Sequence, residues 1–213
     1  LEDSRQVRKL DMYVLEEICR LYQRQKEQGK ILIPVSFNLS RGDFFQGSVF
    51  DEVEEIRKRY QVPRNMLYVE ITESLLVYEG DVLYQEIERF RQAGYEVWMD
   101  DFGSGYSSLN TLKNYSFDEI KIDMAFLSHF TDKSQNIIQA IIRMAKKIGM
   151  HTLMEGVETS EQVEFAKSIG CELLQGYYYG RPMPFEELKR VCQEKHWQVE
   201  TPQLRKYYGS LGA

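Results

Sequence analysis

Two adjacent carboxylates, Asp100 and Asp101, stand in the part of the chain whose residue types are best suited to chemistry. They follow an aromatic and β-branched run, residues 95–98, that is typical of a strand, and Gly103 and Gly105 come shortly after them. Successive side chains of a strand point to opposite faces, so both carboxylates can reach one site only where the backbone turns. Two such groups repel each other unless a cation lies between them, which predicts a divalent metal site. Taken alone, the pair is equally compatible with a simple turn cap.

Composition narrows the class of protein. The 213 residues suffice for one domain, and 43% hydrophobic with 28% charged residues is ordinary for a globular chain. A net charge of −6 argues against a protein that binds duplex nucleic acid. No apolar run approaches 18 residues, so we expect no membrane contact from this segment, and any anchor would lie in other domains.

The sulfur and imidazole side chains show neither zinc-site spacing nor a disulfide framework: Cys19, Cys171, Cys192, His129, His151 and His196. Scattered thiols suit a reducing compartment, which predicts a cytoplasmic location.

Strand and helix patterns alternate six times. Strands are expected at residues 31–39, 66–73, 95–101, 118–123, 151–155 and 172–175. Helices are expected at residues 10–28, 50–60, 82–93, 107–113, 134–148, 161–169 and 185–195, and a peripheral polar tail at 201–213. The alternation predicts an α/β fold with a parallel sheet, either doubly wound or a barrel.

Polar side chains at the carboxyl ends of five expected strands favour the barrel: Asn38, Glu70, Asp100, Asp101, Glu155 and Gln175. Only a closed or nearly closed barrel gathers so many strand ends around one point. A doubly wound sheet concentrates its site at one switch point and usually has a glycine-rich first turn, which this chain lacks.

Lys121 and Asp123 share one face of their expected strand. Lys121 lies between Ile120 and Ile122, which favours an inward side chain near the acids over a surface lysine.

Six segments, in this order, make the chain resemble the EAL-domain family of bacterial cyclic-di-GMP phosphodiesterases: residues 38–40 (NLS), 70–73 (EITE), 100–109 (DDFGSGYSSL), 118–123 (DEIKID), 155–159 (EGVET) and 175–177 (QGY). The resemblance implies a modified TIM-like (β/α) barrel. It also implies metal-dependent hydrolysis of cyclic-di-GMP to linear pGpG with two Mg²⁺ or Mn²⁺ ions.

The resemblance also implies residue roles. Asn38, Glu70 and Asp100 match ligands of one ion, and Asp101 shares the second ion with Asp100. Lys121 matches a lysine that holds the attacking water or the transition-state charge.

The remaining matches lie around this centre. Glu155 matches a proposed general base or its metal-linked partner, and Gln175 matches a residue that lines the site. Tyr177 is a candidate for guanine contact, although rim packing explains it equally well. Supporting acids are expected at the loops: Glu73, Asp123 and Glu158.

Partners follow from the same resemblance: a homodimer, with an upstream sensor or GGDEF-type domain. An apolar face for pairing, or equally a core-packing face, is expected from Tyr106, Leu109, Leu112 and Tyr115.

One departure concerns the motif that names the family, since no Glu-Ala-Leu occurs in the chain. We therefore expect residues 1–200 to be an EAL-type domain lacking its N-terminal segment, with about six of eight strands. A catalytically silent cyclic-di-GMP receptor or dimerisation module and an unrelated barrel hydrolase are the alternatives.

Overall fold

The strands of the computed structural model, which describes residues 5–29, 33–76, 81–104 and 109–197, form one parallel sheet. The strands follow the chain order: β1 (Val35–Leu39), β2 (Leu67–Thr72), β3 (Glu96–Phe102), β4 (Glu119–Ile122), β5 (His151–Met154) and β6 (Leu173–Leu174). Within the described residues, β1 pairs only with β2 and β6 only with β5. The expected six-stranded α/β architecture is therefore confirmed, with both outer strand edges open.

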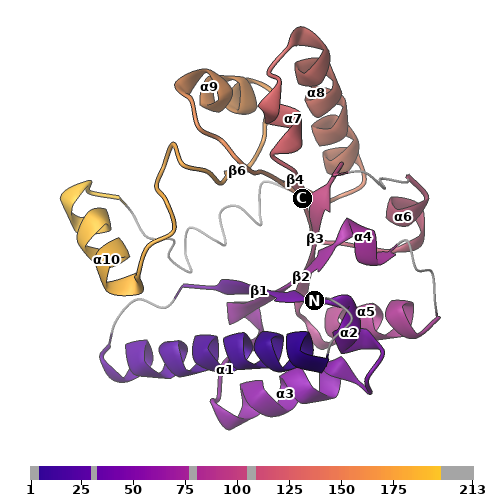
Figure 1. Ribbon diagram of the computed structural model, residues 1–213, viewed down its shortest axis with the longest axis vertical. Coiled ribbons are helices and arrows are strands. Elements are labelled where there is room, and N and C mark those ends of the chain that lie inside the picture. Colours follow the sequence, from indigo (N-terminus) through magenta and orange to yellow (C-terminus); the bar gives the residue numbers. More distant parts are fainter. Residues whose placement is uncertain (1–4, 30–32, 77–80, 105–108, 198–213) are drawn as a thin grey trace.

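Helices precede, connect and follow the strands. They are α1 (Arg5–Glu27), α2 (Arg41–Phe44), α3 (Val49–Arg59), α4 (Glu73–Leu76), α5 (Asp81–Ala93), α6 (Leu109–Asn114), α7 (Ala125–Ser128), α8 (Asp132–Lys147), α9 (Ser160–Ser168) and α10 (Phe185–Glu194), with a 3₁₀ turn, η1 (Arg64–Met66). Figure 1 shows α1 beside β1 and α3 on the far side of α1, with α8 and α9 at the opposite end of the molecule. In the same view α10 stands apart from both groups.

Short polar side chains start several of these helices. Thr131 accepts a hydrogen bond from the Ser134 amide at the start of α8, and Ser48 does the same for Asp51 at the start of α3. These side chains satisfy amide groups that a first helical turn leaves without partners.

The two faces of the sheet differ in chemistry. On β2, Leu67, Val69 and Ile71 are fully buried and belong to the larger of two apolar clusters. The alternate residue Glu70 is also buried, although it carries a carboxylate. Because side chains alternate along a strand, Glu70 points to the opposite face of the sheet from Leu67, Val69 and Ile71, which is the inner face.

Element boundaries depart from the expectations at several strand ends. The expected strand at 118–123 is observed as Glu119–Ile122; just before it, the Asp118 amide donates to the Val97 carbonyl (2.9 Å) and the Asp118 carboxylate accepts from the Val97 amide (2.8 Å). The expected strand at 172–175 is reduced to two residues, and Glu73 begins α4 instead of ending β2. Expectations on residues 31–32, 105–108 and 201–213 lie outside the described residues.

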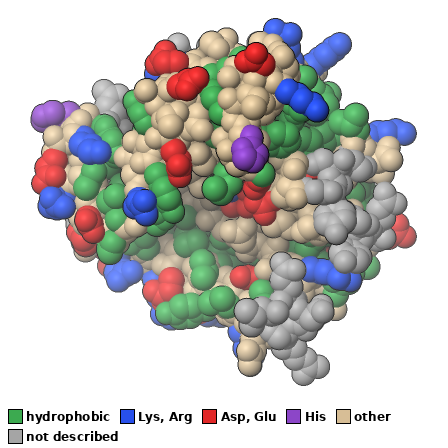
Figure 2. All heavy atoms as spheres, turned by 45° about the horizontal axis from the view of Figure 1, so that its top comes forward, with side chains coloured by type: hydrophobic (Ala, Val, Ile, Leu, Met, Phe, Trp, Pro, Cys, Tyr) green, Lys and Arg blue, Asp and Glu red, His purple; other side chains and the backbone are tan. Residues whose placement is uncertain are grey.

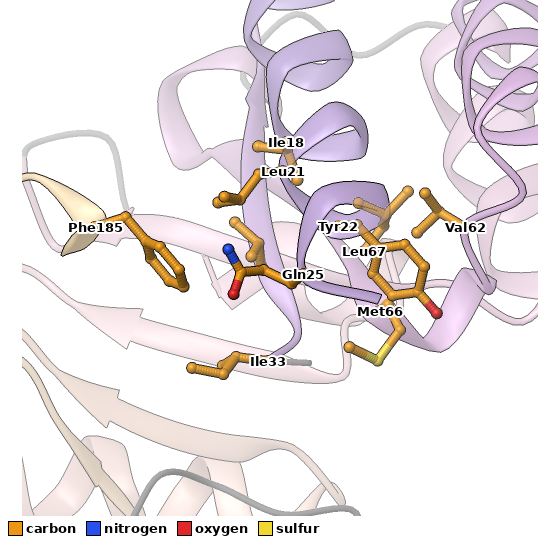
Figure 3. Close-up of a pocket in the computed structure, with 10 residues that line it drawn as sticks. Ile18, Leu21, Tyr22, Gln25, Ile33, Val62, Met66, Leu67 and Phe185 are labelled. Atoms are coloured by element: carbon orange, nitrogen blue, oxygen red, sulfur yellow. The ribbon is translucent and has the colours of Figure 1, made fainter. Parts of the chain in front are cut away.

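An apolar pocket lies at the amino ends of β1 and β2, away from the carboxyl ends that carry the acids, between α1, β1 and the start of α10. Figure 3 shows Gln25 among Ile18, Leu21, Ile33 and Phe185. Phe185 thus brings α10 against the β1 side of the molecule.

In the described part of the chain, no helix combines the length and the apolar character that crossing a membrane requires.

Candidate active site

The two adjacent carboxylates lie at a break in β3. Asp101 has a φ of +57°, and the pairing with β4 shifts register between Met99 and Phe102. A left-handed conformation is uncommon for a residue other than glycine, and it redirects the chain at this point. Asp100 is 8% exposed, and its Oδ1 accepts a hydrogen bond from the Asp101 amide (3.0 Å). The predicted turn at the strand end therefore falls at Asp101 itself.

Lys121 lies at the centre of the site, so the inward prediction is confirmed. Its side chain is buried on β4, and its Nζ contacts three carboxylates from three different strand ends. The contacts are Glu70 Oε2 at 3.1 Å, Asp100 Oδ1 at 2.8 Å and Glu155 Oε1 at 2.9 Å. An ammonium has three hydrogens, so these contacts use its full donor capacity.

The neighbouring carboxylates stabilise the charged form of Lys121. Burial disfavours the Lys121 ammonium, but Glu70, Asp100 and Glu155 more than offset that effect and raise its pKa above the ordinary value. Lys121 is therefore a fixed positive charge.

The acids outnumber this single cation. Burial raises the pKa of Glu155 against the opposing effect of Lys121. Burial, followed by Asp100 and Asp123, raises the pKa of Asp101. Burial is the main cause of both shifts, and neighbouring carboxylates add to it.

The donor set fits a hard divalent cation. One oxygen each from Asp100, Asp101 and Glu155 lie within 4.8 Å of one another. Carboxylate oxygens converging at this spacing suit Mg²⁺, Mn²⁺ or Ca²⁺ rather than thiophilic metals. Figure 2 shows acidic side chains beside a hollow in the middle of one face.

Asn38 lies further from this cluster. It occupies the position on β1 directly opposite Glu70 in the parallel register, and its side chain is exposed. The sheet brings Asn38 to the same edge as the acids.

The loop after the carboxylate pair is held from two sides. Glu73 Oε2 accepts a hydrogen bond from the Gly103 amide (2.9 Å). Gly103 has a φ of +97°, and a Cβ there would clash with the Phe126 ring of α7. Glycine is thus required where α7 packs against the loop.

The other two supporting acids differ from each other. Asp123 Oδ1 accepts a hydrogen bond from the Ala125 amide (2.7 Å), which starts α7. Glu158 is exposed, and its amide, not its carboxylate, is the group that bonds the Gln162 side chain (2.7 Å).

A cleft of about 480 Å³ adjoins the cluster. The sequence analysis placed Glu155, Glu158, Gln175 and Tyr177 near the site, and all four line this cleft. Glycine at position 176 lets this segment lie close to the loop after β5, because a Cβ on Gly176 would clash with the Val157 carbonyl oxygen.

Lining residues that the sequence did not lead us to expect include Met124, Arg181 and Met183. The Arg181 guanidinium lies 4.4 Å from the centre of the Tyr177 ring. Residues 181–183 follow the Gln-Gly-Tyr segment too closely in sequence to leave the cleft, which is the signal that could have identified them.

The comparisons with known proteins agree with this geometry. The EAL domain family model matches residues 1–182. The cyclic di-GMP phosphodiesterase NbdA of Pseudomonas aeruginosa is 32% identical over 203 residues, which are 94% of this chain and 26% of that protein. MucR of the same organism, a bifunctional diguanylate cyclase/cyclic di-GMP phosphodiesterase, is 34% identical over 178 residues, 83% of this chain and 26% of that protein. The chain thus spans about a quarter of the length of these relatives.

Solved structures share the fold. The MucR phosphodiesterase in complex with c-di-GMP superimposes with a TM-score of 0.78 at 34% identity, covering 85% of this chain and 74% of that one. Klebsiella pneumoniae BlrP1, a manganese/cyclic-di-GMP complex, gives a TM-score of 0.70 at 24% identity over 79% of this chain and 44% of that one. With its strand-end acids, buried lysine and matched family model, this chain belongs to the EAL domain family.

Proposed function

We propose that this chain carries the phosphodiesterase centre of a cyclic-di-GMP signalling protein, which hydrolyses cyclic-di-GMP to linear pGpG. The observation that carries the proposal is the contact of the buried Lys121 ammonium with carboxylates of Glu70, Asp100 and Glu155. Membership of the EAL family and the names of NbdA and MucR support the substrate class.

Asn38, Glu70 and Asp100 would hold one Mg²⁺ or Mn²⁺ ion, and Asp100 and Asp101 would share a second. Bound ions of this kind neutralise the phosphodiester and lower the pKa of a coordinated water. The close oxygens of Asp100, Asp101 and Glu155 support this assignment.

In the reaction, the oxygen of a water forms a bond to phosphorus as one P–O3′ bond breaks. The water loses a proton to Glu155, and the departing O3′ gains one and becomes a hydroxyl. Lys121 balances the negative charge that develops in the transition state. Gln175 and Tyr177 contact the nucleotide in the adjoining cleft. Glu73 and Asp123 hold the surrounding loops through their carboxylates, whereas Glu158 bonds its own loop through its backbone amide.

The test is product analysis. Purified protein is incubated with Mg²⁺ or Mn²⁺ and with cyclic-di-GMP, cyclic-di-AMP or a simple phosphodiester, and the products are separated by chromatography. We expect pGpG from cyclic-di-GMP alone and only with metal. Binding of cyclic-di-GMP without pGpG, or equal cleavage of all three substrates, would contradict the proposal.

One observation favours the second candidate, a cyclic-di-GMP receptor without turnover. The sheet is open between β1 and β6 in the described residues, and Asn38 is exposed at that open edge. A ligand set completed by further strands would be needed for two ions, whereas nucleotide binding in the cleft needs fewer groups.

The wider setting is also a proposal. We place residues 1–200 in one EAL-type domain of a cytoplasmic or membrane-attached protein, with residues 201–213 as its tail. A sensor or GGDEF-type domain would precede it, as the name of MucR suggests.

We also propose a homodimer in the complete domain. Tyr115 packs into the core and Leu112 lies against it, which leaves Leu109, 69% exposed, as the apolar contact offered by α6. Tyr106 lies outside the described residues. Light scattering over a range of protein concentrations distinguishes monomer from dimer.

A further inference from the structure

A buried acid on the strand that carries Lys121 has no role in the site as described so far. Glu119 begins β4, two residues before Lys121, so the two side chains share a face. In the parallel register Glu119 lies opposite Trp98 on β3 and His151 on β5. Glu119 therefore belongs to the layer of inner side chains directly beneath Lys121.

This layer is enclosed and partly aromatic. The Tyr68 and Trp98 rings stack with centres 4.5 Å apart. Glu119 is 4% exposed, and its Oε1 has no hydrogen-bond partner among the described residues. An ionised carboxylate in such a place carries a large desolvation cost, whereas a protonated one does not.

The charges that face Glu119 also disfavour its ionisation. Glu96 on β3, whose Oε2 accepts a hydrogen bond from Trp98 Nε1 (3.2 Å), opposes it most strongly among these charges. Glu70 on β2 and Glu172 before β6 act in the same direction, and Lys121 opposes them. His151 on β5 faces Glu172, with Nδ1 3.4 Å from Oε1. Burial first, then Glu96, raises the pKa of Glu119 to about 8.

We propose that Glu119 is a positioning residue for the hydrolysis. It packs beneath Lys121 as a neutral carboxylic acid, and it therefore leaves the Lys121 ammonium directed at Glu70, Asp100 and Glu155. The inference rests on the proposed function. The three hydrogens of Nζ are fully used by these carboxylates. An ionised Glu119 would add a fourth negative charge near Lys121. It would compete with the other three carboxylates for the Lys121 ammonium, so the ammonium would be drawn away from the site as pH rises.

The first experiment measures the pH profile of kcat/KM for cyclic-di-GMP with Mg²⁺ between pH 6 and 9.5. Loss of a required proton with a pKa of about 8 halves the protonated fraction at pH 8 and reduces it to about a tenth at pH 9, so the rate of the parent protein should fall about fivefold between these pH values. Glu119→Gln keeps a neutral side chain of nearly the same shape beneath Lys121. It should stay within about twofold of the parent at pH 7 and lose most of this decline.

A matched control makes the same charge change elsewhere. Glu161 is exposed in the first turn of α9, so Glu161→Gln should keep the parent profile. Glu96→Gln removes the negative neighbour of Glu119, so the decline should begin at lower pH. A Glu119→Gln profile that matches the parent, or no shift for Glu96→Gln, would overturn the inference.

Thermal unfolding gives a readout that needs no activity. A carboxyl whose folded-state pKa is raised from 4.5 to about 8 stabilises the fold through its bound proton. That contribution is complete below pH 4.5 and is lost as pH rises through 8, so the parent should lose stability across this window more steeply than Glu119→Gln.

The two readouts separate the two claims. If the parent releases no pGpG at any pH but Glu119→Gln flattens the unfolding profile, the proposed function fails and the buried neutral acid stands. If the unfolding profiles coincide, the inference about Glu119 fails whatever the rates.

Discussion

Asp100 is the residue on which the acid cluster depends most directly. Its Oδ1 contacts Lys121 Nζ at 2.8 Å and accepts a hydrogen bond from the Asp101 amide, and its carboxylate would be shared by the two proposed ions. A change at this carboxylate therefore tests the chemistry with little change in shape.

We predict that Asp100→Asn lowers kcat at least about a thousandfold while the protein stays folded. The amide can still accept from Lys121, but a ligand charge is lost where transition-state charge must be balanced, at a cost of several kcal/mol. Rates of pGpG formation and thermal unfolding measure the two effects. Asp132→Asn, the same change at an exposed helix start, should leave both unchanged. Activity within a few-fold of the parent would contradict the assignment of Asp100 as a metal ligand.

At the scale of elements, α4 and α7 hold the loop that leaves β3. Glu73, the first residue of α4 and 1% exposed, accepts the Gly103 amide, and Phe126 of α7 packs against the same glycine. The loop directly follows the carboxylate pair of β3, so its anchoring should govern how the site responds to substrate.

We predict that Glu73→Ala raises KM for cyclic-di-GMP with a smaller effect on metal affinity. The change leaves the Gly103 amide without this acceptor, which costs about 1–3 kcal/mol of stability when the group is buried. Glu73→Gln retains an acceptor oxygen and should recover part of the loss. Calorimetric Mn²⁺ titration compares Glu73→Ala with Asp100→Asn, and an equal drop in affinity would show that Glu73 is a ligand instead of a support.

At the scale of the whole molecule, the open sheet is the dominant feature. Strands β1 and β6 have one partner each among the described residues, and unpaired parallel edges favour association with other chains. Closing the barrel needs strands between them.

We predict that a version of the protein extended upstream through a Glu-Ala-Leu segment hydrolyses cyclic-di-GMP at least about tenfold faster than these 213 residues alone. The added strands would close the gap, complete the ligands and lower nonspecific association. Rates of pGpG formation and light scattering on the two proteins give the comparison. Equal rates would refute the eight-strand, two-ion account.

Local pattern was enough to predict much of this protein. Hydrophobic periods of two and 3.6 residues predict the alternation of strands and helices. They also predict the inward direction of Lys121 and the strand-end positions of Glu70, Asp100 and Glu155. These features depend on neighbours within a few residues, which a sequence displays directly.

Other features depended on contacts between distant segments. Packing and strand register account for three such features: the left-handed conformation of Asp101, the hydrogen bond of Glu158 through its amide, and the shortness of β6. The enclosure of Glu119 is of the same kind, because its neighbours come from β2, β3, β5 and the segment before β6. The period of two places Glu119 beneath Lys121, but only the folded sheet removes the water around it, and that loss of solvent is what keeps its carboxyl neutral.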